Sequence, residues 1–326
     1  MVKRITFSEA EALLRSREEI LLTGLTERGL ATAIDSGALL RVHRGWYVAV
    51  EDWADLWSEG RHLLRVIALA RSTPGAGPVF VGASAAVLWG LPLYRQDSSI
   101  THTLIRGRRH ARTVSRVARH DLDIDESDIV ERHGLLCTSL VRTVFDMSRV
   151  MSLEAAVSAA DAALAQVAVQ RHRQIEERAA QWRDEFRMLE RAGLRGIRQA
   201  RWVAEFADGR AQLPGESVSR LQLFRLGFSD VELQVPISGA DGDQYFLDFG
   251  FRRSRRFGEF DGEGKYLENG MLRGDTPAGV VFAEKRREDD VRGVTGWSFA
   301  RWGGKHILTP DALGARLALF GIRPPG

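Results

Sequence analysis

The order of apolar and polar positions near the N-terminus predicts two short helices followed by a hairpin. Ser8 and Glu11 have the spacing of a capping box at the start of the first helix. Thr26 is placed to cap the second helix, which Gly37 ends. Residues 38–50 then carry β-branched and aromatic residues on both sides of a short polar turn, which predicts two paired strands.

Helices followed by a small hairpin are the element order of a winged helix. In such a domain the second helix enters the major groove of DNA, and the tip of the wing contacts phosphate or the minor groove. The side chains expected to contact DNA in this way are those of Arg28, Thr32, Arg41, His43 and Arg44. Because Glu27 and Asp35 offset the charge of Arg28, a protein-interaction module is the alternative.

The middle of the chain is predicted to be mixed in secondary structure. Residues 51–165 form an α+β region whose last part has helix-favouring alanines and an apolar face. Residues 168–190 continue as a charged helix with apolar residues on one side, the pattern of a linker helix packed on a neighbour, within a helical linker of residues 166–212. The predicted domains are therefore residues 1–50, 51–165, 166–212 and 213–326.

After Pro214 the pattern predicts helices alternating with strands. A helix (GESVSRLQLFRLGF) leads to an extended run (VELQVPI) and to a hairpin of two acidic segments. A buried strand (GVVFAE, residues 279–284), a charged helix (KRREDDVRG) and a further strand (WSFARW) follow. Thr309 is predicted to cap a terminal helix that starts with Pro310. The sequence as a whole predicts a multidomain α/β protein.

Composition narrows the class of protein. The 326 residues are 44% hydrophobic, which is enough for more than one core. The net charge of +3 and the pI of about 9.3 permit nucleic-acid binding without requiring it. Pro74, Pro78 and Pro92 interrupt the longest uncharged run, so no membrane span is expected. The single Cys137 excludes an intramolecular disulfide and, with no secretory segment visible, suggests a cytoplasmic protein.

The candidate chemistry lies in the stretch FLDFGFRRSRRFGEFDGEGKY, residues 246–266. If its strands pair around a turn at residues 253–254, the antiparallel register sets Asp248 opposite Glu259 and brings Asp261 onto the same face. Directly opposed like charges sit about 5 Å apart at Cβ and destabilise the pair, which implies a neutralising group. A divalent cation such as Mg²⁺ is the simplest one.

Lys265 and Glu216 complete this predicted site. Mg²⁺ held by Asp248 and Glu259 would serve phosphodiester hydrolysis, with Lys265 stabilising charge on the phosphate or positioning the attacking water. Glu216, in the first turn of the preceding helix, is expected to be a further ligand or an orienting group. The alternative is a solvated hairpin whose carboxylates pair with the arginines of the turn. These arginines are also expected DNA contacts: Arg252, Arg253, Arg255 and Arg256.

Several motifs between residues 195 and 320 occur together in one known family. They are Gly215, Glu216 and Ser217, then Leu247 and Asp248, then Glu259, Phe260, Asp261 and Gly262 with Lys265 and Tyr266, and finally EKRRED at 284–289, Trp297, Arg301 and Trp302. This set resembles the restriction-endonuclease-like domain related to very-short-patch repair endonucleases. The resemblance implies a PD-(D/E)xK-like mixed sheet flanked by helices that binds Mg²⁺ and cuts DNA.

The acidic positions of that family match Glu216, Asp248 and Glu259, but the lysine position does not match. Asp261 stands two residues after Glu259, where the family has lysine. Either Lys265 substitutes from further along, or the mechanism is altered, or cleavage has been lost and only binding kept. The sequence therefore leaves open whether the protein is an enzyme.

The first half of the chain resembles a second family. The stretch GLTERGLATAIDSGALLRVHRGWYV, within residues 20–50, and the stretch TSLVRTVFDMSRVMSLEAAVSAADAAL, at 138–164, are similar to AbiEi-type antitoxins. That resemblance implies a winged helix that binds the protein's own promoter and represses it. The implied partners are double-stranded DNA and a cognate nucleotidyltransferase-type toxin.

These observations lead to one hypothesis and two alternatives. The leading hypothesis is a DNA-binding transcriptional regulator or antitoxin of a toxin–antitoxin or defence locus, which carries a nuclease-fold domain. The first alternative is a Mg²⁺-dependent DNA endonuclease targeted by its N-terminal domains. The second is a non-catalytic protein-interaction module.

Overall fold

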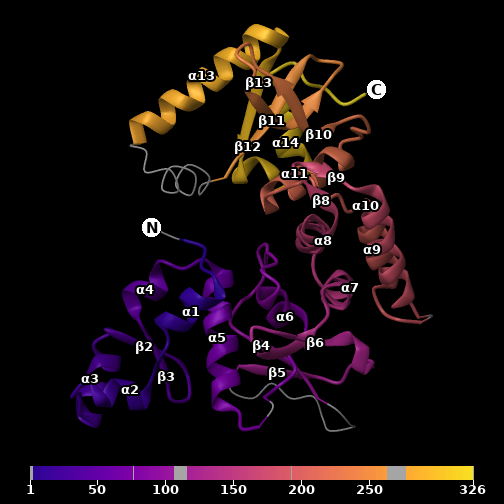
Figure 1. The fold of residues 1–326 in the computed structure, drawn as a ribbon. Coiled ribbons are helices and arrows are strands. Elements are labelled where there is room, and N and C mark those ends of the chain that lie inside the picture. Colours follow the sequence, from indigo (N-terminus) through magenta and orange to yellow (C-terminus); the bar gives the residue numbers. More distant parts are fainter. Residues whose placement is uncertain (1–2, 76, 106–115, 192, 263–276, 326) are drawn as a thin grey trace. The chain divides into compact units, whose positions relative to one another are not determined.

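The chain folds into helices and several small sheets (Figure 1). The computed structural model describes residues 3–75, 77–105, 116–191, 193–262 and 277–325. It divides into two compact units: unit 1 comprises Met1–Ala159 and Glu185–Arg201, and unit 2 comprises Ala160–Asp184 and Trp202–Gly326. The prediction of a mixed α/β chain with more than one folding unit is confirmed at this level. The finer division into four segments stays a prediction.

Unit 1 begins with three helices and a small sheet. The elements are α1 (Phe7–Leu13), β1 (Arg15–Ser16), α2 (Arg17–Leu22), α3 (Glu27–Asp35), β2 (Leu39–His43) and β3 (Trp46–Ala49). The predicted hairpin is confirmed, and Gly45 at its turn has a φ of 79°, a conformation that glycine adopts without strain. Strand β1 adds to the free edge of β3, so that the sheet order is β1-β3-β2. Ile20, Leu30 and Tyr47 form the core beneath the helices.

The caps of these helices agree with the sequence at one position and differ at another. Thr26 caps α3 as predicted, because its Oγ1 accepts a hydrogen bond from the Gly29 amide at 3.1 Å. The capping box of α1 is formed by Thr6 and Glu9, two residues before the predicted Ser8 and Glu11. The Glu9 carboxylate accepts a hydrogen bond from the Thr6 amide at 2.7 Å, and Ser8 lies inside the helix.

The rest of unit 1 places short strand pairs beside helices. The elements are α4 (Val50–Ala54), α5 (Ser58–Ser72), α6 (Gly82–Leu88), β4 (Thr101–Leu104), β5 (Val117–His120), a 3₁₀ turn (Glu126–Asp128), β6 (Ile129–Arg132), β7 (Leu135–Thr138), α7 (Leu140–Val150) and the start of α8 (Leu153–Ala168). Cys137 is buried in β7, and burial raises the pKa of its thiol to about 12. Arg142 is held between Asp128 and Asp146, each at 2.9 Å, so the buried charges are compensated.

Unit 2 is built around one four-stranded sheet. Its elements are the end of α8, β8 (Val169–Gln170), β9 (Arg173–Gln174), the start of α9 (Glu176–Met188), the end of α10 (Ile197–Phe206), α11 (Pro214–Arg225), β10 (Glu232–Ser238), β11 (Gln244–Phe251), β12 (Arg256–Asp261), α13 (Pro277–Thr295), β13 (Ser298–Gly303), a 3₁₀ turn (Gly304–Ile307) and α14 (Pro310–Ala318). The strand order is β10-β11-β12-β13. The first three strands are antiparallel, whereas β13 runs parallel to β12.

The two faces of this sheet are covered by different helices. Phe299 of β13 packs with Val291 of α13, together with Leu247 and Phe257. Trp302, three residues further along the same strand, points to the opposite face and donates its Nε1 hydrogen to Ser219 of α11 at 2.8 Å. Residues two positions apart on a strand share a face. Side chains of β12 and β13 that lie an even number of residues from Phe257 or Phe299 are therefore on the α13 face.

One predicted element of unit 2 is wrong. Residues 279–284 are predicted as a buried strand, but they lie inside the helix α13, which continues without a break to Thr295. A short apolar run has no periodicity that separates a strand from a helix, and Pro277 at the helix start fits the helical alternative. Phe282, within that run, is exposed. The apolar run therefore does not form a further strand of the sheet.

Candidate functional site

The first candidate site is the surface of α3 and the β2–β3 hairpin in unit 1. Arg28 and Thr32 are exposed on α3, and Arg41 and Arg44 are exposed on the hairpin. The Thr32 hydroxyl donates to the Arg28 carbonyl at 2.9 Å, an i−4 bond that keeps this side chain close to the helix. These cations and this hydroxyl are therefore accessible to a ligand on the surface of one small unit.

The remaining predicted contact, His43, is less accessible. Its ring is half-buried, and burial lowers its pKa, with the nearby Arg41 lowering it further. His43 is therefore neutral at physiological pH and offers hydrogen bonds rather than charge. On α3, Glu27 forms an ion pair with Arg17, so the acidic end of the helix is partly neutralised by a residue outside it.

The second candidate site lies where the hydrogen-bonded pairing of β11 with β12 ends. The predicted antiparallel register is observed over Phe249↔Gly258, Gly250↔Phe257 and Phe251↔Arg256. The ladder stops one pair short of Asp248 and Glu259. There the Asp248 carboxylate accepts a hydrogen bond from the Phe260 amide at 3.0 Å, so a side chain takes the place of a main-chain partner.

Asp248 and Glu259 are both buried and interact electrostatically. Burial raises the pKa of Glu259, Arg287 opposes that rise, and the charge of Asp248 adds to it. Glu259 lies on the α13 face of the sheet, directly across from Arg301 in the parallel ladder. The predicted proximity of these two carboxylates is therefore present, with arginines beside them.

The arginines that contact Glu259 come from α13 and β13. Arg287 lies one helical turn before Val291, so both side chains point toward the sheet. Arg287 Nη2 donates to Glu259 Oε1 at 2.5 Å, and Arg301 Nε donates to Glu259 Oε2 at 3.1 Å. Sequence reasoning missed both residues, although EKRRED and the strand ending in Arg301 stand in the matched motifs.

Glu216 lies elsewhere in the polar network of unit 2. It is buried at the start of α11, and its Oε2 accepts hydrogen bonds from the Gln212 amide at 2.9 Å and from the Gln234 side chain at 3.5 Å. Gln234 lies between the pairs Leu233↔Phe249 and Val235↔Leu247, which places it across from Asp248. Its φ of 49° is unusual for a residue with a side chain. Gln234 thus links Glu216 to the strand of Asp248, and no sequence motif indicates this role.

The remaining predicted residues of this site are only partly described. Asp261 ends β12, and its charge acts on Arg301. Lys265 lies outside the described residues. Across the described ranges, there is no group of three His, Cys, Asp or Glu side chains that could hold a metal ion. The structure therefore does not bring Glu216 together with Asp248 and Glu259 as one ligand set.

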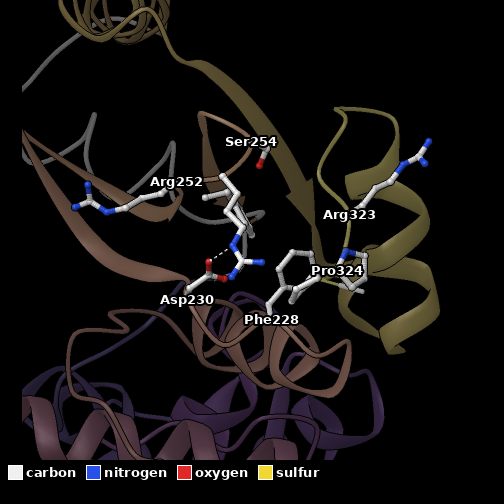
Figure 2. A pocket seen from close by; sticks show the side chains of 9 residues that line it. Phe228, Asp230, Arg252, Ser254, Arg323 and Pro324 are labelled. Carbon is white, nitrogen blue, oxygen red and sulfur yellow. Dashed lines mark ion pairs between the residues drawn. The ribbon is translucent and has the colours of Figure 1, made fainter.

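Two of the turn arginines pair with carboxylates outside the predicted site. Arg252 pairs with Glu232 at 2.6 Å, and Arg253 pairs with Asp230 at 2.9 Å. These arginines border a hollow of about 180 Å³ that is also lined by Phe228 and the C-terminal Pro324 (Figure 2). The labelled side chain of Arg252 points away from this hollow, while Phe228 and Pro324 face each other (Figure 2). The turn arginines thus form a surface of their own.

The other two arginines of the turn differ from each other. Arg255 is exposed in a left-handed conformation with a φ of 51°. Arg256 donates from Nη1 to the carbonyls of Ser254 and Arg255, both at 3.1 Å, and so closes the turn. Arg255 is the more accessible of the two.

Comparison with known proteins identifies relatives but no activity. No family model matches the chain. The chain is 30% identical over 237 residues to the uncharacterized protein Rv2248 of Mycobacterium tuberculosis, and this match covers 73% of the chain and 79% of the relative. The uncharacterized protein MT2308, from another strain of the same species, matches with the same identity and coverage. The chain belongs to the Rv2248 family. The names of these two members of the Rv2248 family state no activity.

The helices give one further result about this member of the Rv2248 family. Within the part of the chain that the structure describes, no helix has both the length and the apolar character needed to cross a membrane.

Proposed function

We propose that the protein is a DNA-binding transcriptional regulator or antitoxin of a toxin–antitoxin or defence locus. The observation that carries the proposal is the arrangement of residues 7–49. The elements follow in the order α1, β1, α2, α3 and the β2–β3 hairpin, and the three strands form a sheet of order β1-β3-β2. This is the element order of a winged helix, the class in which a helix enters the major groove. The resemblance of residues 20–50 and 138–164 to AbiEi-type antitoxins supports the regulatory role.

The charges on this surface support contact with phosphate. Arg28, Arg41 and Arg44 are exposed, and the wing residues Arg41 and Arg44 belong to one hairpin. Each contacted phosphate releases counterions, so the affinity for DNA should depend on salt. Helix α3 and the wing are thus assigned the DNA-contacting roles that the sequence predicts for residues 26–37 and 38–50.

The test compares duplex binding by full-length variants, measured by fluorescence anisotropy at several salt concentrations. Arg44→Ala should weaken binding and reduce the slope of log affinity against log salt by about 1. Arg178→Ala is the matched control, because Arg178 is exposed on α9 in unit 2 and its loss removes the same charge. Equal affinities and slopes for Arg44→Ala and the wild type would refute the assignment of the wing.

A second candidate function, Mg²⁺-dependent DNA cleavage, is favoured by the carboxylates of unit 2. The order α11, β10, β11, β12, α13, β13, with β13 parallel to β12, suits a restriction-endonuclease-like core. Asp248 and Glu259 come close on neighbouring strands and are both buried. Because Mg²⁺ binds one or two carboxylates and completes its shell with water and phosphate oxygens, two carboxylates would suffice as its protein ligands.

In this second candidate, Asp248 and Glu259 would hold the metal, which would supply charge stabilisation at the phosphate. Asp248 is kept in position by the Phe260 amide, and Gln234 ties its neighbouring strand to Glu216. Asp248→Asn, which keeps the shape of the side chain, should abolish nicking of plasmid DNA while duplex binding through unit 1 is retained. Nicking at the same rate by Asp248→Asn and the wild type would exclude this site.

A further inference from the structure

Glu259 is held by two guanidinium groups on the α13 face of the unit 2 sheet. Arg287 Nη2 donates to Oε1 at 2.5 Å and Arg301 Nε to Oε2 at 3.1 Å, so each carboxylate oxygen already has a cationic donor. A Mg²⁺ ion needs such an oxygen as a ligand and is repelled by both positive charges. This arrangement therefore opposes metal binding at Glu259.

The same two arginines have other carboxylates to hold. Arg287 donates to both oxygens of Glu284, at 2.7 and 2.9 Å. Arg301 Nη2 lies 2.7 Å from Glu284 and 3.1 Å from Glu288. Releasing Glu259 therefore leaves neither arginine without an anionic partner, which lowers the cost of the release.

Solvent reaches the arginines more readily than it reaches the acid between them. The side chains of Arg287 and Arg301 are 22% and 27% exposed, whereas that of Glu259 is 10% exposed. A phosphate group approaching this face meets the guanidinium groups first. Guanidinium binds phosphate through paired hydrogen bonds. An arginine that already pairs with a carboxylate can still offer its remaining N–H groups to a phosphate.

We infer that Arg287 and Arg301 couple DNA binding to metal binding at the site: a DNA phosphate that engages these arginines frees Glu259 to hold a divalent cation together with Asp248. This inference rests on the proposed metal-dependent cleavage site. The phosphate also brings negative charge next to the carboxylates, which favours a cation there. Because coupling between two ligands is reciprocal, the metal should tighten DNA binding by the same factor.

The experiment titrates full-length protein with Ca²⁺ in a calorimeter, with and without a saturating mixed-sequence DNA duplex. Ca²⁺ is used because it is a hard cation that takes oxygen ligands. We expect Ca²⁺ to bind roughly 5- to 150-fold more tightly when the duplex is present. Asp248→Asn, measured in the same way, identifies the part of the heat that belongs to this site rather than to the duplex.

Two arginine variants then separate the contact with Glu259 from general charge. Arg301→Gln should bind Ca²⁺ about tenfold more tightly than the wild type without DNA, and the effect of the duplex should shrink by the same factor. Arg286→Gln also removes one positive charge, from α13 rather than from β13. Because the Arg286 side chain packs on the ring of Phe282, this variant should bind Ca²⁺ as the wild type does.

The outcomes distinguish this inference from the proposed cleavage site. Ca²⁺ binding that Asp248→Asn abolishes, but that has the same affinity with and without the duplex, overturns the coupling and leaves the metal site in place. Heat that Asp248→Asn does not change under either condition overturns both. The comparison with and without DNA relies on the wild type and Asp248→Asn, so poor folding of Arg301→Gln does not prevent a decision.

Discussion

At the scale of single residues, Gly258 marks a closely packed point of the unit 2 sheet. A Cβ atom at this position would lie 2.5 Å from Cη2 of Trp302 and 2.9 Å from Cε2 of Phe251. Gly258→Ala should therefore lower the free energy of unfolding by roughly 1–3 kcal/mol, because two buried rings must move. Denaturant unfolding of the full chain measures the change.

Gly293 provides the matched control for that substitution. It lies inside α13, and a Cβ there would meet no other atom within 4 Å. Gly293→Ala should raise the free energy of unfolding by about 0.5–1 kcal/mol, since alanine favours a helix. A destabilisation by Gly293→Ala as large as that by Gly258→Ala would contradict the packing described for the sheet.

A buried histidine, His62, and a partly buried one, His102, make the stability of unit 1 depend on pH. Burial lowers the pKa of His62 and of His102 from 6.5 to about 4. Between these values the unfolded chain binds protons that the folded chain does not, so the free energy of unfolding should fall as the pH drops from 6.5 to 4. For His62 the loss is at most about 3 kcal/mol.

The measurement compares wild type with His62→Gln, whose amide does not titrate. Unfolding free energies at several pH values should give a flatter dependence for the variant between pH 6.5 and 4. The slope is the readout, because removing the ring also removes its contacts with Ser84 and Ser98 at 2.9 and 2.8 Å. Parallel pH curves for the two proteins would show that His62 is not the titrating group.

The candidate site shows what residue patterns can and cannot predict. The register that brings Asp248 near Glu259 follows from strand alternation and a symmetric turn, both of which are local. The partners of Glu259 are not local, because Arg301 is placed by the parallel pairing of β12 with β13 and Arg287 by the packing of α13. For the same reason the turn arginines, adjacent in sequence, pair with Asp230 and Glu232 instead.

At the scale of elements, the segments with strong local signals are those that the sequence predicts. The hairpin β2–β3 has a glycine turn, and α14 has Thr309 as its cap and Pro310 at its first position. Residues 279–284 lack such a signal, since a short apolar run suits a strand or a helix equally well. Their helical state depends on the continuous helix that follows them.

Helix α8 and helix α11 are joined within unit 2 by a buried ion pair. Arg220 Nη2 lies 2.7 Å from Oδ1 and 2.9 Å from Oδ2 of Asp161, and the Asp208 amide donates to Asp161 at 2.8 Å. Asp161→Ala leaves the arginine without its partner and should lower the free energy of unfolding by about 3–5 kcal/mol.

A surface pair serves as the control for that variant. Arg201 pairs with Glu190 at 2.6 Å, and its side chain is largely exposed. Arg201→Ala should change the free energy of unfolding by about 0–1 kcal/mol in the same denaturant assay. Equal decreases in the free energy of unfolding for Asp161→Ala and Arg201→Ala would mean that burial does not determine how much the Arg220–Asp161 pair stabilises the protein.

At the scale of the whole molecule, two compact units carry two different candidate surfaces. Unit 1 presents exposed arginines on α3 and a hairpin, and unit 2 presents the Asp248–Glu259 pair with its two arginines. The sequence predicts a multidomain chain with a helical linker at residues 166–212. In the structure, residues 185–201 of this segment belong to unit 1 and the rest of it belongs to unit 2. Helical periodicity reports that such a segment packs on a neighbour, but it does not say on which one.

We propose that the protein binds DNA through phosphate contacts. The most direct test of this proposal is the affinity of the wild-type full-length protein for a mixed-sequence duplex, measured across a series of salt concentrations. We predict that log affinity falls linearly with log salt, with a slope of about −0.9 for each contacted phosphate. Failure to bind the duplex at low salt, or an affinity that does not change with salt, would contradict the claim.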